Sequence, residues 1–329
     1  MTLAAALTKR PDKSRQPIII IGAHRSGTTM VAESLSAMGL FMGKDLVGHH
    51  ESYFFEQRND LILKACNGGW DNPTAVVGLW QHPPTQAQIS KMLRDDLKSS
   101  HMLLFLGPVR YLKYRSAFNL DFPWGWKDPR NTILLPLWLE IFPQAKIIHV
   151  LRNGVDVAAS LSLREKERLQ AGAFFGGNAI SKLKNFFGSL DRGELPFKLF
   201  LKMTQRIEQF TPLHRYWVAR AQRCLSLEYG FELWEHYVEC ADQFTATLPS
   251  DKILHIRYED LLRAPIEHLG ALRDFCELPV AEELLARIAS GINGDRAFAF
   301  RNQLDLVALY QRVRDNQRMK QFGYDKIEL

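Results

Sequence analysis

The sequence predicts an α/β fold of three layers, in which a central, mainly parallel sheet is flanked by helices on both faces. Short runs rich in Ile, Val and Leu occur at residues 17–21, 146–151 and 252–257. Such runs are typical of parallel strands that are buried on both faces. Each run is followed by a segment with a helical pattern, and strands that alternate with helices indicate a parallel sheet.

Glycine and proline indicate where the helices end, because both interrupt regular backbone hydrogen bonding. Gly39 closes the helix expected after the first strand, and Pro143 closes a later one. Residues 41–82 are expected to be irregular, and the apolar run at 101–106 is expected to form a further strand. The expected helices span 28–38, 83–99, 131–142, 154–163, 215–224, 228–247, 266–276, 280–289 and 303–320.

No linker rich in Pro or Gly divides the chain. We therefore expect a single domain over residues 17–329, preceded by a flexible leader at residues 1–16. Residues 164–215 differ in composition, because they are rich in Lys, Arg and Phe. We interpret this segment as an insertion or a lid.

Composition narrows the class of ligand. The 329 residues include 42 Lys and Arg against 36 Asp and Glu, which gives a formal net charge of +6. A mild basic excess suits an anionic ligand, and the absence of a nucleic-acid-binding motif favours a small molecule over nucleic acid. Four cysteines without a CxxC pair predict reduced thiols in a cytoplasmic protein. No apolar run is long enough to span a bilayer, so stable membrane insertion is not expected.

The segment from Gly22 to Gly27 has the spacing and context of a phosphate-binding loop of the P-loop NTPase type, between a strand and a helix. Its glycines let the backbone approach an anion, and the helix N-terminus supplies positive potential. Thr28 and Thr29 follow where the Walker pattern requires Lys. The missing lysine, and the lack of an acidic strand end for magnesium, argue against ordinary nucleotide hydrolysis and predict no metal site. Arg25 can replace the missing charge.

A second anion site is expected at the end of the strand 146–151. Arg152 follows this strand, so its guanidinium can reach a ligand at the carboxyl edge of the sheet. Arginine suits forked binding of phosphate, and Ser160 lies about two turns into the next helix. Asn153 and Asp156 fit the start of that helix. Together the two strand ends predict a ligand with two separate anionic groups.

At these residues the chain resembles the sulfotransferases that use 3′-phosphoadenosine 5′-phosphosulfate (PAPS). Residues 24–29 are similar to that family's 5′-phosphosulfate loop, and Arg152 with Ser160 is similar to its 3′-phosphate site. The segment 258–262 is similar to a further recurring element, in which we interpret Tyr258 and Glu259 as structural. The resemblance covers about residues 17–40, 120–163 and 250–278. It implies a donor site made of His24, Arg25, Ser26, Gly27, Thr28, Thr29, Arg152 and Ser160.

The resemblance also implies the reaction and its catalytic residues. A sulfuryl group would move in line from PAPS to a hydroxyl or amine of a small-molecule, carbohydrate or lipid acceptor, without a metal. Lys127, in a run similar to the family's Lys-x-Pro element, is implied to face the leaving group. Glu56 ends a segment similar to one that carries an acidic base, and two preceding Phe residues favour a raised pKa. We expect Glu56 as the base, then Glu51, with a histidine as the remaining alternative.

Two other functions stay open at this stage. One is a nucleotide kinase or NTPase with a degenerate P-loop, and the other is a non-catalytic nucleotide-binding protein. The missing Walker lysine argues against the first, and the pairing of Lys127 with Glu56 argues against the second. Arg296 and Arg301, on a late loop, are additional candidates for the 3′-phosphate. The identity of the acceptor and the oligomeric state are left open.

Overall fold

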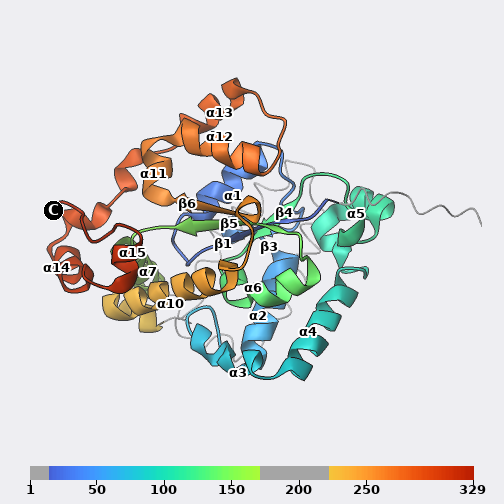
Figure 1. Ribbon diagram of the computed structural model, residues 1–329, viewed down its shortest axis with the longest axis horizontal. Helices are drawn as coiled ribbons and strands as arrows, with labels where there is room; N and C mark the ends of the chain where they lie inside the picture. Colours follow the sequence, from blue (N-terminus) through green and yellow to red (C-terminus); the bar gives the residue numbers. More distant parts are fainter. Residues whose placement is uncertain (1–14, 171–221) are drawn as a thin grey trace, which may run out of the picture.

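The computed structural model describes residues 15–170 and 222–329, and within them it contains a four-stranded parallel sheet (Figure 1). The strand order is β4-β1-β5-β6, so β1 is central. This confirms the predicted three-layer α/β architecture and three of its four predicted strands. The strands are β1 (Ile18–Ile21), β4 (Gly125–Lys127), β5 (Lys146–Leu151) and β6 (Ile253–Arg257).

Helices lie on both faces of the sheet, and a short hairpin of β2 (Leu46–Val47) and β3 (Glu51–Ser52) precedes the second helix. No helix of the described part combines the length and apolarity that crossing a bilayer requires. The helices are α1 (Thr28–Ala37), α2 (Tyr53–Ala65), α3 (Val77–Trp80), α4 (Pro83–Asp96), α5 (Met102–Tyr114), α6 (Asn131–Ile141), α7 (Gly154–Gln170), α10 (Leu227–Thr245), α11 (Tyr258–Arg263), α12 (Pro265–Phe275), α13 (Glu282–Ala289), α14 (Leu304–Val313) and α15 (Gln317–Gln321).

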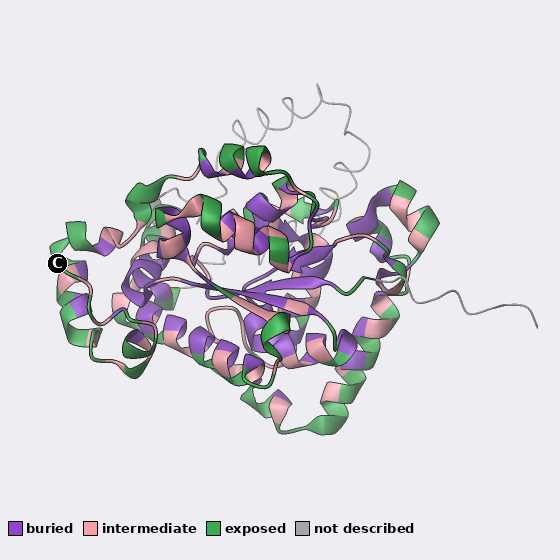
Figure 2. Ribbon diagram, turned by 45° about the horizontal axis from the view of Figure 1, so that its top comes forward, coloured by how far each residue is buried: buried purple, intermediate pink, exposed green. Residues whose placement is uncertain are grey.

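The side chains of β1 alternate between two hydrophobic clusters, one on each face of the sheet. Ile18 and Ile20 pack with α1, α12 and α13, whereas Ile19 and Ile21 pack with α2, α6, α7 and α10. All four are buried, and Figure 2 shows the buried strands between the two helical layers. Full burial of an Ile side chain contributes about 1.5–3 kcal/mol, so this one strand joins both layers strongly.

One predicted strand is wrong. Residues 101–106 were expected to be extended, but Met102 begins α5. Met102, Phe105 and Leu106 are the buried residues at its start, and their spacing of three and four is helical. Gly107, with φ of 70°, interrupts the regular geometry before Pro108. In a run as short as this, continuous apolar residues hide the helical period.

The expected irregular region, residues 41–82, is also wrong in part, because it contains α2. Phe54, Phe55, Ile62 and Leu63 form the apolar side of this helix, and the charged residues between them are half-buried. The helix is recognisable only through this partial spacing, which the many polar residues obscure.

Several predicted boundaries need smaller corrections. The helix expected at 154–163 continues to Gln170, so residues 164–170 belong to α7 rather than to a lid. The remainder of the predicted lid at 171–215, and most of the helix predicted at 215–224, lie outside the described residues. The helix expected at 303–320 is two helices, α14 and α15. Arg15, assigned to the leader, donates its backbone N–H to Leu120 and accepts from the Trp124 indole.

The strand order creates a crevice at the carboxyl edge of the sheet between β1 and β5. The helix that follows β1, α1, packs on one face of the sheet, and the helix that follows β5, α7, packs on the other. The two connecting loops therefore diverge. Open parallel sheets bind their ligands at such a switch point, which is where both predicted anion sites lie.

The loop between β1 and α1 is fixed against α11. Gly27 has a φ of 96°, in the left-handed region, and a Cβ atom at this position would overlap the ring of Tyr258. Tyr258 is itself 5% exposed and cannot move aside freely. Glycine is therefore required at position 27 both for its backbone conformation and for close packing.

We expect Gly27→Ala to destabilise the protein more than Gly39→Ala does. Both glycines have a positive φ, but a Cβ atom at Gly39 would meet nothing within 4 Å. Gly39→Ala should cost about 1–2 kcal/mol through backbone strain alone. Gly27→Ala should cost a further 1–3 kcal/mol, approximately, from the overlap with Tyr258. Equilibrium unfolding in urea measures the free energy of unfolding of both variants. Equal decreases in the two variants would show that the contact between position 27 and Tyr258 is unimportant.

Candidate functional site

A cavity of about 590 Å³ opens at the carboxyl edge of the sheet. Its walls come from segments that follow three adjacent strands: the glycine loop after β1, Lys127 at the end of β4, and Arg152 after β5. Because parallel strands present their carboxyl ends at one edge, residues 100 and more positions apart converge here. The volume is in the range of small-molecule and cofactor sites.

Two hydrogen bonds fix the conformation of the glycine loop. Gly22 donates its backbone N–H to the Thr132 hydroxyl at 2.9 Å, and Ser26 donates its hydroxyl to the Ala23 carbonyl at 2.7 Å. Ser26 is buried and does not line the cavity, so its side chain shapes the loop. Sequence reasoning did not identify Thr132, whose distance of 110 residues from Gly22 gives no local signal.

Thr28 and Thr29 begin α1 and line the cavity, as do Arg25 and Gly27. The backbone N–H groups in the first turn of a helix have no intrahelical partners, and they create positive potential at its N-terminus. Gly27 caps α1 without a side-chain hydrogen bond. This end of the cavity is therefore suited to an oxyanion.

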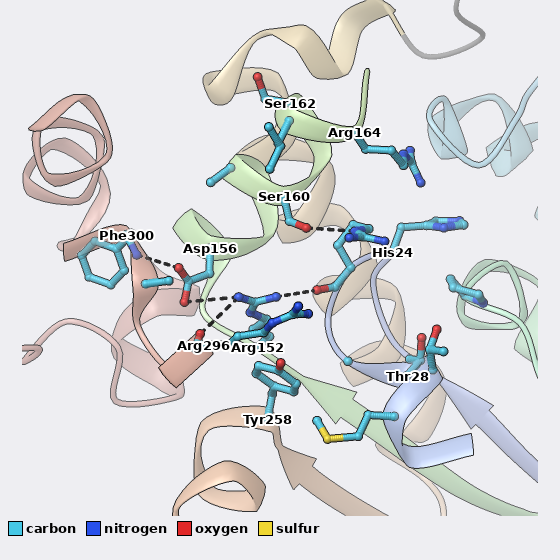
Figure 3. A pocket seen from close by; sticks show the side chains of 18 of the residues that line it. His24, Thr28, Arg152, Asp156, Ser160, Ser162, Arg164, Tyr258, Arg296 and Phe300 are labelled. Atoms are coloured by element: carbon cyan, nitrogen blue, oxygen red, sulfur yellow. Dashed lines mark hydrogen bonds and ion pairs between the residues drawn. The ribbon is translucent and has the colours of Figure 1, made fainter. Parts of the chain in front are cut away.

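Three contacts hold Arg152 in place at the predicted second anion site. Its Nη1 donates to the Arg25 carbonyl at 3.2 Å, its Nη2 donates to the Arg296 carbonyl at 3.4 Å, and the guanidinium lies 4.7 Å from the centre of the Tyr258 ring. Asp156 lies 3.8 Å away (Figure 3). The Nε of Arg152 is buried and has no hydrogen-bond partner in the described part of the chain. An unpaired buried donor is costly, and a bound anion would satisfy it.

Arg25 links the two predicted sites. It has a φ of 71°, and its Nε donates to the Ser160 hydroxyl at 2.9 Å. Burial, followed by the nearby charges of Arg164, Arg152 and Arg296, lowers the pKa of Arg25 from its ordinary value. The group stays cationic, since an arginine remains protonated at neutral pH. Several positive charges thus converge on one cavity, and an anionic ligand would relieve their mutual repulsion.

Lys127 and Glu51 form a buried ion pair in the cavity. The Lys127 side chain is 1% exposed, and its Nζ donates to Glu51 Oε1 at 2.8 Å. Burial, followed by the neighbouring charge of Asp128, raises the pKa of Glu51 to about 7. A carboxyl group that titrates near neutral pH is suited to proton transfer. Sequence reasoning placed Glu51 second to Glu56.

Glu56 lies beside this pair but does not line the cavity. Its carboxylate lies 3.3 Å from Arg130 Nη2. Burial raises the pKa of Glu56 as predicted, and the Arg130 charge opposes that shift. The geometry therefore brings Glu51, rather than Glu56, next to Lys127.

Arg130 organises the carboxylates behind the cavity. It contacts Asp128 at 2.8 Å, Glu51 at 3.4 Å and Glu56 at 3.3 Å, and it is 6% exposed. These acidic groups raise the pKa of Arg130 in spite of its burial. The sequence run 126–130 indicated this region. The ion pairs of Arg130 with Glu51 and Glu56 are a property of the fold and leave no pattern in the sequence.

A buried polar network supports the end of β4. Asn59 donates to Asp128 and to Asn131, each at 2.8 Å, while Trp126 donates its indole N–H to Asn131 at 3.1 Å. Trp126 also stacks on Phe55 at 4.0 Å between ring centroids. Because Trp126 and Asp128 flank Lys127, the network fixes the direction of the lysine side chain.

His24 is placed differently from the rest of its loop. Its imidazole packs against Trp70, with 4.5 Å between ring centroids, and against Tyr237 at 5.9 Å. Burial, followed by the charge of Arg164, holds the pKa of His24 well below its ordinary value. The neutral ring lines the cavity, and its buried Nε2 has no partner among the described residues. Trp70 was not identified from the sequence.

The residues interpreted as structural do have structural contacts. Glu259 is 1% exposed, and its carboxylate accepts from the Asn153 N–H and the Tyr324 hydroxyl, each at 2.8 Å. Asn153 accepts from the N–H of Val155 at 3.0 Å and so caps α7. Tyr258 packs on Gly27 and Arg152 and also lines the cavity. Arg296 lines it as well, whereas Arg301 does not.

Three solved structures are similar over most of the chain. The sulfotransferase domain from the Synechococcus PCC 7002 olefin synthase has 18% sequence identity and a TM-score of 0.43, covering 92% of this chain and 97% of that one. The sulfotransferase domain from the curacin biosynthetic pathway has 16% identity and a TM-score of 0.44, covering 91% and 98%. Sulfotransferase STF1 from Mycobacterium tuberculosis H37Rv has 12% identity and a TM-score of 0.42, covering 91% and 76%.

One protein relative is an uncharacterised protein of Aquifex aeolicus (strain VF5), which is 27% identical over 154 residues. The matched region is 47% of this chain but only 18% of that relative's length. Two family models match the chain itself. The model described as sulfotransferase domain matches residues 135–296, and the model described as sulfotransferase family matches residues 17–185, just over half of the chain. The chain belongs to the sulfotransferase family.

Proposed function

We propose that this chain transfers a sulfuryl group from PAPS to a hydroxyl or amine of a small-molecule, carbohydrate or lipid acceptor. The proposal includes no metal and no nucleic acid, and it takes the protein to act in the cytoplasm. The observation that carries it is the convergence of three elements on one cavity: the glycine loop, Arg152 with Ser160, and the pair Lys127–Glu51.

The donor suits the charges of this cavity. Its 5′-phosphosulfate would lie on the loop Gly27–Thr29 and Arg25, where helix N–H groups and a guanidinium face the cavity. Its 3′-phosphate would bind Arg152 and Ser160, and it would satisfy the buried Nε of Arg152 that has no partner in the described ranges. The hydrogen bond from Arg25 to Ser160 holds the two groups of residues at a fixed separation.

The catalytic step requires a base for the proton of the acceptor and a cation for the leaving oxygen. In our proposal Glu51 accepts the proton of the acceptor hydroxyl as its oxygen bonds to sulfur. The bond between sulfur and the bridging phosphate oxygen breaks, and Lys127 stabilises the charge on that oxygen. The ion pair at 2.8 Å connects the two roles. Once Glu51 is protonated, its attraction for Lys127 weakens, and the ammonium is free to interact with the leaving oxygen.

The donor site can be tested by binding alone. We expect 3′-phosphoadenosine 5′-phosphate to raise the melting temperature in the absence of magnesium, since a ligand that binds only the folded state stabilises it. Arg152→Gln should reduce the shift strongly, because it removes a guanidinium that faces the cavity. Arg312→Gln, which changes an exposed arginine outside the cavity, is the matched control and should keep the full shift. Stabilisation by Mg-ATP alone would overturn the proposed donor.

The choice of base can be tested with two conservative variants. We expect Glu51→Gln to lower kcat by about 10²–10⁴-fold, the usual contribution of a general base. Glu56→Gln should keep most of the turnover, because Glu56 contacts Arg130 and does not line the cavity. Both variants should keep the melting shift with 3′-phosphoadenosine 5′-phosphate. If only Glu56→Gln loses turnover, Glu56 is the base.

The same assignment predicts a pH dependence. The base acts only when it is ionised, and the pKa of Glu51 is raised to about 7. The value of kcat/KM should therefore fall as pH decreases through about 7, by about tenfold per pH unit below it. The Glu51→Gln variant should not show this decrease of kcat/KM at low pH. A wild-type profile that stays flat from pH 5 to 8, with chemistry rate-limiting, would contradict the role of Glu51.

A further inference from the structure

One face of α7 continues the cavity wall beyond the donor loop. Ser160, Leu163, Arg164, Glu167 and Arg168 line an outer compartment next to the main cavity, and their spacing of three and four places them on one side of the helix. Arg25 and His49 complete its lining among the described residues. The compartment therefore begins at the sulfate end of the proposed donor site and extends away from it.

Arg164 is the unusual residue on this face. Its guanidinium lies 4.5 Å from the centre of the Trp70 ring, and its Nε donates to Glu165 at 2.9 Å. The side chain is 14% exposed, and the buried Nη2 has no hydrogen-bond partner in the described part of the chain. The Trp70 ring and the Glu165 carboxylate thus fix the plane of the guanidinium and leave one end of it unsatisfied. A buried donor of this kind indicates a ligand group.

The proposed donor does not account for Arg164. In Figure 3, Arg152 and Arg296 lie toward one side of the pocket, whereas Arg164 and His24 lie toward the other, with Ser160 between them. The 3′-phosphate is assigned to Arg152, and the sulfate end to Arg25 and the loop. Arg164 stands one helical turn beyond Ser160, a rise of about 6 Å along α7. It therefore lies beyond the sulfate end of the proposed donor site.

The local charge on α7 is not cancelled by Glu165 alone. Glu165 is fully buried, and its Oε1 accepts from both Arg164 at 2.9 Å and Arg168 at 3.1 Å. One carboxylate is thus shared between two guanidinium groups. Glu167 and Arg168 are both exposed, and water screens exposed charges far more than buried ones, so the less exposed Arg164 carries the charge that matters most in the outer compartment.

We propose that the acceptor is an acidic molecule whose carboxylate, phosphate or sulfate group binds Arg164, which places its hydroxyl or amine toward Glu51. The proposal rests on the proposed sulfuryl transfer and specifies the class of acceptor. A planar guanidinium held by stacking is well suited to oxyanions, because little entropy is lost when the bond forms. The neutral ring of His24, which also packs on Trp70, lines the same side of the cavity. Arg164 is a specificity-determining residue in this scheme.

The experiment compares acids with uncharged partners that keep a hydroxyl group and lack the acidic group. The probe pairs are 4-hydroxyphenylacetate with 4-hydroxyphenylacetamide, methyl glucuronoside with methyl glucoside, and glycerol 3-phosphate with glycerol. Calorimetry gives the ratio of dissociation constants within each pair, on protein saturated with 3′-phosphoadenosine 5′-phosphate. We expect at least one acid to bind wild-type protein about tenfold or more tightly than its partner. The carboxylate and phosphate pairs distinguish the kinds of acid.

Three variants show whether Arg164 causes the preference. Arg164→Gln should reduce the acid-to-neutral ratio to about one, and Arg164→Lys should keep part of it, because the charge remains without the planar fork. Arg312→Gln removes an exposed positive charge outside the cavity and should leave the ratio unchanged. The melting shift with 3′-phosphoadenosine 5′-phosphate reports folding and donor binding separately in each variant.

Two results would overturn the proposal: no acid preferred over its partner by wild-type protein, or a preference that survives in Arg164→Gln. If turnover assays show that Arg164→Gln slows acidic and neutral acceptors equally, Arg164 acts on the transferred group and not on the acceptor. Failure of the proposed function can be told apart from failure of the acceptor proposal. If the proposed function is wrong, 3′-phosphoadenosine 5′-phosphate causes no melting shift in wild-type protein. In that case the same pairs are compared on the free protein, and the ratio still decides the role of Arg164.

Discussion

The pairing of β1 with β4 on one side and β5 on the other is the constraint on which the site depends. In this register Ile20 lies opposite both Lys127 and Ile148, so β1 and β4 end within one residue of each other, whereas β5 continues to Leu151. The glycine loop, Lys127 and Arg152 all line one cavity at this edge of the sheet. A shift of one residue between β1 and β4 would direct Lys127 to the other face of the sheet, because side chains alternate along a strand.

The charges behind the cavity are stable only as a group. Lys127, Arg130, Glu51 and Asp128 are all at least 90% buried, and isolated burial would cost several kcal/mol for each ion. Two positive and two negative charges offset one another, and Asn59 supplies a further hydrogen bond to Asp128 at 2.8 Å. A buried group of charges need not add to stability, but it fixes charged side chains in one arrangement. Fixed charges near a reaction centre stabilise a transition state without reorganising.

The sequence was sufficient to predict much of the fold, because β1, β5 and β6 are apolar runs followed by helices. It did not predict β4, whose three residues contain no such run and which is defined by its partner β1. The residues proposed for the donor loop could be selected from the sequence because they are contiguous. The sequence did not show which of Glu51 and Glu56 lies next to Lys127. That placement depends on the antiparallel pairing of Val47 with Glu51 before α2 begins. The contact between Trp70 and Arg164 joins distant segments and likewise leaves no local pattern.

The helix α7 has a consequence for how such a site can change. Asn153 caps its first turn, Ser160 contacts Arg25, and Arg164 lies one turn further along. Residues on one continuous helix keep their spacing, whereas residues on separate loops can drift independently. In our proposal, substitutions near Arg164 on the cavity side of this helix therefore alter which molecules are accepted, while the Ser160 end remains unchanged. The first half of α7 therefore serves donor binding in our proposal, and the second half serves the choice of acceptor.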